Sequence, residues 1–228
     1  MLEKITVQIH LDKVNLVGDL ILPGNPLGII IFSHGSGSSR LSPRNQFVAQ
    51  VLNESGFATL LFDLLTDNES QVYTNRFNIN MLTERLIAAT HWTLPQSKIA
   101  GLRAGYFGAS TGAASALNAA ASLGDSIKAV VSRGGRPDLA MTELSKVTAP
   151  VQLIVGSKDY DVIKMNEEAF RKIQSPKQLV IIEGATHLFE EPGKLEEVAY
   201  KASTWFQKYL ALNSVTKEDK QDAKSFKV

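Results

Sequence analysis

Residues 105–112 read Gly-Tyr-Phe-Gly-Ala-Ser-Thr-Gly, and the small-residue segment 113–123 follows as Ala-Ala-Ser-Ala-Leu-Asn-Ala-Ala-Ala-Ser-Leu. The first stretch starts as a buried strand would, and the second is typical of a helix. A strand that turns sharply into a helix brings the two backbones so close that the positions flanking the turn cannot carry side chains. Gly108 and Gly112 meet this requirement around Ser110. The stretch therefore predicts a nucleophile elbow, with the Ser110 hydroxyl above the edge of a sheet.

Apolar runs and helical periodicity alternate along the rest of the chain. Six short, continuously apolar runs are typical of strands buried on both faces, and they cover residues 29–32, 58–62, 104–107, 127–131, 151–155 and 179–182. Helical periodicity covers residues 45–52, 79–92, 166–173 and 195–212 between and after them. Two alternating stretches, 5–11 and 14–22, predict an antiparallel pair at one edge. Together they predict a mostly parallel, doubly wound α/β sheet of about eight strands flanked by helices.

Ligands of such sheets bind beyond the carboxyl ends of the strands, so the residues that follow each run are the candidate site. A serine nucleophile needs a general base, which is usually histidine. Of the four histidines, His187 leaves the last strand's carboxyl end and follows Ser110 in the order serine, acid, histidine. His34 is interpreted as a loop organiser, and His10 and His91 as surface or core-edge residues.

The acid that orients the base is expected after the strand 151–155, in Gly-Ser-Lys-Asp-Tyr-Asp at 156–161. Asp159 is the preferred candidate and Asp161 its rival. Asp63 follows another strand and is interpreted as a loop anchor.

Two backbone N–H groups are expected to hold a developing oxyanion. One belongs to Thr111, at the helix N-terminus, and the other to Ser36 in the loop Ser-His-Gly-Ser-Gly-Ser-Ser at 33–39. That loop lacks both the third glycine of a dinucleotide fingerprint and the Gly-Lys-Ser/Thr of a phosphate-binding P-loop, and no His-Glu-x-x-His pair occurs. No cofactor and no metal are therefore expected.

Several further side chains could contact a substrate. Tyr73, Arg76 and Phe77 lie in the long connection 64–78, which we expect to form a minor lid over an open site. Arg133 and Arg136 follow a strand, where they could pair with an anionic substrate group or form loop salt bridges, for example to Asp138.

Composition narrows the class of protein. The 228 residues are 44% hydrophobic, carry a net charge of +1 and include no cysteine. One domain is predicted over residues 1–212, with a charged, solvated tail at 213–228. The balanced charge argues against nucleic acid as a partner. No apolar run is long enough to span a membrane, and the N-terminus Met-Leu-Glu-Lys-Ile lacks the basic region and long apolar run that begin a leader, so a cytoplasmic protein is the expectation.

Four blocks of sequence, 33–37, 105–112, 153–159 and 184–189, together resemble the α/β-hydrolase superfamily, specifically its dienelactone-hydrolase-like branch. The resemblance spans residues 14–212 and implies Ser110, Asp159 and His187 as the triad. Dienelactone hydrolases themselves use a cysteine nucleophile, whereas this chain has Ser110 and no cysteine. Many relatives insert a cap after the strand that follows the elbow helix, and the connection 133–140 is too short for one.

These features favour a hydrolase of small or medium carboxylic esters that acts through an acyl-enzyme on Ser110. Thioesterase, acyltransferase or peptidase activity with the same triad is the enzymatic alternative. A non-catalytic binding protein that keeps the fold is a third reading, and the sequence shows no missing triad member to favour it.

Overall fold

The computed structural model describes residues 2–11 and 13–211, and within them the strands form one sheet in the order β1-β2-β4-β3-β5-β6-β7-β8. The strands are β1 (Glu3–His10), β2 (Asn15–Leu22), β3 (Ile29–Ser33), β4 (Ala58–Phe62), β5 (Ala104–Ala109), β6 (Ile127–Arg133), β7 (Val151–Gly156) and β8 (Lys177–Ile182). The predicted hairpin is confirmed, because β1 pairs antiparallel with β2 at the sheet edge. β2 is also antiparallel to β4, while β4, β3 and β5 to β8 run parallel.

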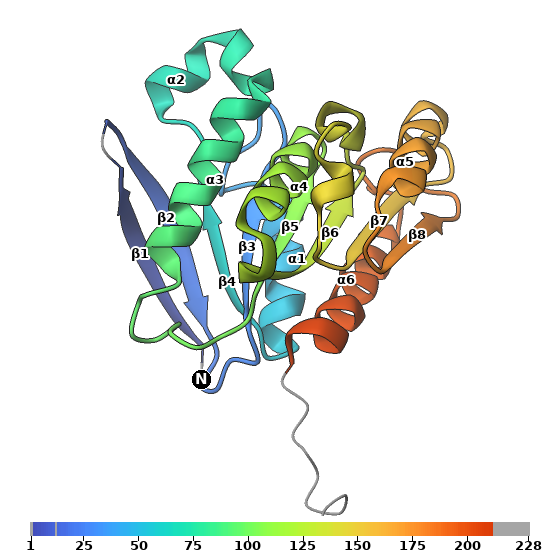
Figure 1. Cartoon of the computed structure of the whole chain (residues 1–228). Helices are drawn as coiled ribbons and strands as arrows, with labels where there is room; N and C mark the ends of the chain where they lie inside the picture. Colours follow the sequence, from blue (N-terminus) through green and yellow to red (C-terminus); the bar gives the residue numbers. More distant parts are fainter. Residues whose placement is uncertain (1, 12, 212–228) are drawn as a thin grey trace, which may run out of the picture.

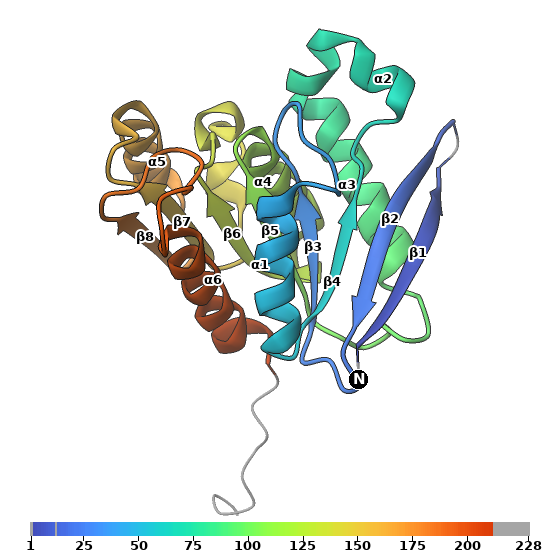
Figure 2. The same cartoon turned by 180° about the vertical axis from the view of Figure 1, so that it is seen from behind.

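Helices cover both faces of this sheet. α1 (Pro43–Glu54) and α6 (Lys194–Leu210) lie on one face, and α3 (Ile79–Thr93), α4 (Thr111–Leu123) and α5 (Tyr160–Lys172) lie on the other (Figures 1 and 2). Two apolar clusters fill the two layers between sheet and helices. The doubly wound α/β arrangement predicted from the sequence is therefore confirmed.

The apolar runs form strands because sheet and helices remove them from water on both faces. Every residue of β3, β4, β5 and β7 is buried, and each large aliphatic side chain buried in this way contributes about 1.5–3 kcal/mol. The expectation of two-sided burial was wrong for β8. This strand lies at the sheet edge, and its Ile181 side chain is 41% exposed.

Helix α5 begins six residues before the periodic segment that predicted it. Asp159 occupies its N-cap position, and Tyr160 and Asp161 form a polar, exposed first turn, so the apolar spacing starts only later. The predicted tail at 213–228 lies outside the described residues, and the single domain over 1–212 stays a prediction.

The long connection after β4 holds α2 (Asp67–Gln71) and the 3-10 helix η1 (Tyr73–Phe77). Thr66 and Glu69 cap α2 reciprocally, each side chain accepting the other's backbone N–H. Figure 1 shows this segment at the end of the molecule to which the carboxyl ends of the parallel strands point, beyond the sheet. The connection from β6 to β7, which the structure describes throughout, contains the 3-10 helices Pro137–Ala140 and Leu144–Lys146 and no α-helix.

The junction between β5 and α4 depends on two glycines. A Cβ atom at Gly112 would overlap the carbonyl oxygen of Ser33 on β3, and one at Gly108 would lie 2.5 Å from the Cα of Ala113. Both obstacles are backbone atoms, which cannot rotate away as a side chain could. The turn from β5 into α4 thus requires glycine at both positions.

We expect Gly112→Ala to lower the free energy of unfolding by about 3 kcal/mol or more, because the new methyl group forces β3 and α4 apart. Urea denaturation followed by circular dichroism measures the change. Gly24→Ala is the matched control, since a Cβ there meets nothing within 4 Å, and it should stay within about 0.5 kcal/mol. Equal stability of the two variants would contradict the packing described for Gly112.

Candidate active site

Ser110 lies at the carboxyl end of β5, at the N-cap position of α4, with φ 52° and ψ −123°. Among the described residues, Phe189 is the only other non-glycine residue with a positive φ. Left-handed backbone is costly for a side-chain-bearing residue and concentrates at functional sites. The elbow predicted from the sequence therefore has the strained geometry expected of it.

His187 and Asp159 meet at the same edge of the sheet. The Nδ1 atom of His187 lies 2.6 Å from Oδ2 of Asp159, and the two side chains are 38% and 16% exposed. Because a carboxylate only accepts, Nδ1 carries the proton and Nε2 is left as the acceptor. Asp161, the rival acid, is exposed in the first turn of α5.

The backbone after β6 lies between the Ser110 elbow and the His187 loop. Ser110 N–H donates to the carbonyl of Arg133 at 3.2 Å, and a Cβ at Gly134 would lie 3.5 Å from Cε1 of His187. Within residues 2–11 and 13–211 the Ser110 hydroxyl makes no hydrogen bond to His187. In the absence of substrate, the hydrogen bond between a nucleophile and its base is often long or poorly aligned, and it shortens when substrate binds.

The loop after β3 packs directly against the elbow. A Cβ at Gly35 would lie 3.0 Å from the Cβ of Ser110. The N–H of Ser36, which the sequence indicated as an oxyanion donor, donates to the Thr111 hydroxyl at 2.8 Å. Sequence reasoning did not foresee that this amide already has a partner.

His34 organises this loop. Its Nδ1 lies 3.0 Å from the Gly35 carbonyl, and its Nε2 accepts the N–H of Leu64 at 3.0 Å. Burial holds the pKa of His34 below its usual value, so the ring stays neutral with the proton on Nδ1. These contacts fit the structural interpretation of His34, whereas His10 and His91 are exposed.

Arg40 fastens the far end of the same loop. Asp63 accepts the Arg40 backbone N–H at 2.8 Å and also pairs with the guanidinium. The Nε atom of Arg40 lies 3.8 Å from Asp19 on β2. Asp63 is thus a loop anchor, and the loop after β3 is tied both to β2 and to the end of β4.

A cavity of about 240 Å³ opens beside Ser36. Its walls come from the loop after β3, the connection after β4 and the first turn of α3, and they include His34, Ser36, Arg40, Asp63, Leu65, Arg76 and Leu82. Of the lid residues expected from the sequence, Arg76 lines this cavity. Tyr73 and Phe77 are 68% and 45% exposed, and their rings lie 5.2 Å apart outside it.

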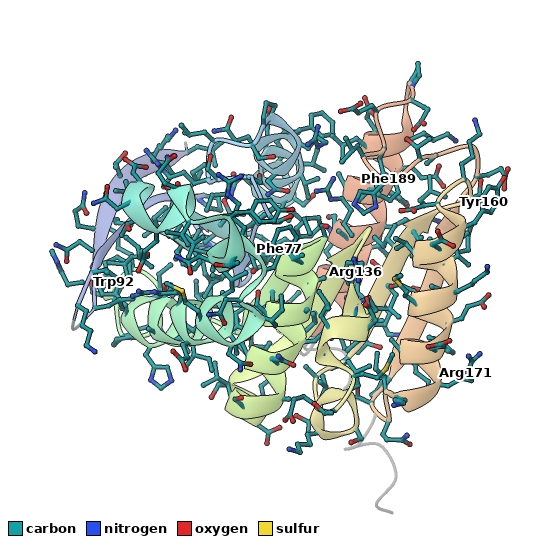
Figure 3. The ribbon with its side chains drawn as sticks, turned by 90° about the horizontal axis from the view of Figure 1, so that it is seen from above. Phe77, Trp92, Arg136, Tyr160, Arg171 and Phe189 are labelled. Carbon is teal, nitrogen blue, oxygen red and sulfur yellow. The ribbon has the colours of Figure 1, made fainter. Side chains whose placement is uncertain are left out.

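The two arginines after β6 have different surroundings. Arg136 forms a two-point bond with Asp138, at 2.9 and 2.8 Å, which raises the pKa of Arg136. Arg133 is buried and contacts Asn45 on α1. Figure 3 views this end of the molecule from above, with Phe77 and Arg136 near its middle and Phe189 beyond them.

Two residues of this region escaped the sequence reasoning. Glu191 accepts the N–H of Thr186 with both carboxylate oxygens, at 3.1 and 3.2 Å, which lowers the pKa of Glu191 and holds the loop beside His187. Arg44 lies in the first turn of α1, next to Arg133. A basic residue in the first turn of a helix opposes the helix dipole. This unfavourable position of Arg44 was the feature of the sequence that could have identified it.

The described part of the chain contains no group of three or more His, Asp or Glu side chains placed to hold a metal ion. Across residues 2–11 and 13–211, no helix combines the length and apolar character that crossing a membrane requires.

The model of the dienelactone hydrolase family matches residues 17–214. The chain belongs to the dienelactone hydrolase family. A dienelactone hydrolase from Anabaena variabilis has the same fold, with a TM-score of 0.89 and 50% identity over 92% of this chain and 99% of its own. The esterase domain of a Rhodothermus marinus protein, at 18% identity and a TM-score of 0.72 over 92% and 99% of the two chains, shares the fold.

Two curated Mycobacterium tuberculosis proteins, provisionally named phosphoribosyl transferases, are each 52% identical to this dienelactone hydrolase family member over 204 residues. The match covers 90% of this chain but 46% of theirs, so the chain spans about half the length of these relatives. The family assignment supports a hydrolase for residues 17–214.

Proposed function

We propose that this protein is a serine hydrolase that cleaves carboxylic esters of small or medium size through an acyl-enzyme on Ser110. The observation that carries the proposal is the 2.6 Å bond between His187 and Asp159 at the edge where the strained Ser110 ends β5. Nucleophile, base and orienting acid then come from the ends of β5, β8 and β7, in the chain order of this fold.

In the proposed reaction the Ser110 hydroxyl attacks the acyl carbon and gives its proton to His187 Nε2. Collapse of the tetrahedral intermediate expels the alcohol, which takes that proton. Water then attacks the acyl-enzyme, again losing a proton to His187, and the acid leaves as Ser110 is regenerated. Asp159 keeps His187 in the reactive tautomer and stabilises the imidazolium.

The N–H groups of Thr111 and Ser36 are the proposed oxyanion donors. Because Ser36 N–H donates to the Thr111 hydroxyl, the oxyanion must replace that hydroxyl as its acceptor. The exchange conserves the number of hydrogen bonds and strengthens one of them, since a charged acceptor binds more tightly than a hydroxyl.

The name of the Mycobacterium tuberculosis relatives suggests phosphoribosyl transfer as another activity. More than half of each of those proteins lies outside the match, whereas residues 17–214 here match the dienelactone hydrolase model. Ester hydrolysis is therefore the activity we assign to this chain. Acyl transfer with the same residues is its alternative, and added alcohol or amine acceptors would reveal it by competing with water.

The first experiment is hydrolysis of p-nitrophenyl esters from acetate to long acyl chains by the wild type and Ser110→Ala. We expect the wild type to hydrolyse esters of this series, with a chain-length profile that measures the size of the acyl pocket, and kcat to fall by about 10⁴ or more in the variant. Equal rates in the two proteins, with both folded by circular dichroism, would rule out Ser110 as the nucleophile.

Asp159→Asn and Asp161→Asn separate the two candidate acids. Asp159→Asn should lower kcat by about 10⁴, because an amide that donates to Nδ1 favours the wrong tautomer of His187. Asp161→Asn has the same change of charge two residues away and should stay within about twofold of the wild type. A larger loss in Asp161→Asn than in Asp159→Asn would reverse the assignment.

Thr111→Val tests the oxyanion exchange, because valine keeps the shape and the backbone N–H but removes the acceptor that holds Ser36 N–H. We expect kcat/KM for p-nitrophenyl acetate to equal or exceed the wild-type value. Thr111→Ser, which keeps a hydroxyl, is the control. A fall of about 10² or more in the valine variant alone would show that the hydroxyl itself donates to the oxyanion.

A further inference from the structure

Arg133, at the carboxyl end of β6, is a buried cation whose charge is not matched locally. Strand alternation turns it toward α1 and α6, the face on which Ala129 and Val131 pack, and the residue is 7% exposed. Its Nη2 reaches Asn45 Oδ1 only at 3.5 Å, and its Nε and Nη1 have no partner within the described residues. A guanidinium without partners is among the costliest groups to bury.

A second arginine adds to this excess charge. Burial lowers the pKa of Arg133, and the charge of nearby Arg44, in the first turn of α1, lowers it further. Together they bring the pKa of Arg133 to about 10. Arg44 Nη1 pairs with Glu190 at 2.8 Å, yet its buried Nε finds no partner among the residues described. Among the described residues, the exposed carboxylate of Glu190 pairs with Arg44, and no carboxylate pairs with Arg133.

The N-terminus of α1 contributes further positive potential. Its first turn contains no acidic residue, its N1 residue Pro43 has no N–H, and the Ser42 side chain accepts the Asn45 N–H at 3.5 Å. The contribution of this terminus is therefore mainly the positive end of the helix dipole, which favours an anion. Asn45, which Arg133 contacts, belongs to this turn, so the buried guanidinium is aimed at the helix terminus.

The other arginines at this end of the molecule have partners. Arg136 is matched by Asp138, and Arg40 by Asp63 and Asp19. Arg76 has no carboxylate partner, but its Nε donates to the Ser70 carbonyl at 2.9 Å. Within the described chain, the buried guanidinium of Arg133 has no ion pair, and its one hydrogen bond is the 3.5 Å contact with Asn45.

We propose that Arg133, Arg44 and the N-terminus of α1 form a binding site for a small oxyanion, a carboxylate or a phosphate group. The planar fork of a guanidinium fits either group with two parallel bonds. Arg44, whose side chain is 34% exposed, lies on the side open to solvent, and Arg133 forms the floor.

The position of this anion site relates it to the substrate. The Arg133 carbonyl accepts the Ser110 N–H, and the next residue, Gly134, adjoins the ring of His187. Resting on the proposed function, the inference is that the ester substrate carries a carboxylate or phosphate group, which this site holds beside the nucleophile.

Binding is tested first, on the full-length protein, by thermal unfolding in sodium acetate, sodium phosphate or sodium chloride at equal ionic strength. We expect acetate or phosphate to raise Tm above the chloride value in the wild type and equally in Ser110→Ala. The increase should disappear in Arg133→Gln and shrink in Arg44→Gln, which stays informative if Arg133→Gln does not fold. Arg171→Gln, on the exposed side of α5 (Figure 3), loses the same charge elsewhere and should respond as the wild type does.

Substrate selection is tested with two esters of matched length, p-nitrophenyl butyrate and mono-p-nitrophenyl succinate. The ratio of kcat/KM for the succinate to that for the butyrate should fall about tenfold in Arg44→Gln, the equivalent of one charge-assisted hydrogen bond, and stay unchanged in Arg171→Gln. An unchanged ratio in Arg44→Gln would overturn the role in substrate selection.

The anion site is overturned if neither anion raises the wild-type Tm above chloride, or if Arg44→Gln and Arg133→Gln respond as fully as Arg171→Gln. A response to phosphate alone assigns the site to phosphate groups, and a response to acetate alone assigns it to carboxylates. Anion binding by a protein that hydrolyses no ester would leave the site standing and remove the proposed function, so the two failures are distinguishable.

Discussion

The absence of a side chain at Gly112, where α4 passes the Ser33 carbonyl, is the constraint on which the rest of the site depends. It brings the start of α4 against β3, and Gly35 in turn brings the following loop to within 3.0 Å of Ser110. A buried 2.7 Å hydrogen bond between the hydroxyls of Ser33 and Ser115 fixes the same junction. The relative positions of Ser36, Ser110 and Thr111 are thus set by backbone packing.

Most of the architecture could be predicted because its causes are local in sequence. The runs 29–32 and 151–155 are apolar without interruption since sheet and helices cover both faces, and the glycines around Ser110 are spaced as a tight turn requires. The exposure of β8 was harder to predict, because an apolar run does not show whether a strand has one neighbouring strand or two. The first turn of α5 was missed because its exposed residues carry no apolar period.

The details of the site were less predictable because they depend on residues far apart in sequence. Strand order placed Asp159 near His187, but only the structure separates it from Asp161, two residues away. The contact of Ser36 N–H with the Thr111 hydroxyl joins residues 75 positions apart, and Arg133 meets Asn45 across 88 positions. The charged residues after β6 show no periodicity. Composition and spacing therefore could not show that Arg136 pairs with a carboxylate whereas Arg133 does not.

Arg40 shows how the loop that carries Ser36 is kept in order. Its contacts with Asp63 and Asp19 tie a glycine- and serine-rich segment, which would otherwise sample many conformations, to two strands. The entropy lost in fixing that segment is therefore part of the free energy of folding. A ligand that arrives beside Ser36 meets a loop already in place, so its affinity is not reduced by the cost of ordering one.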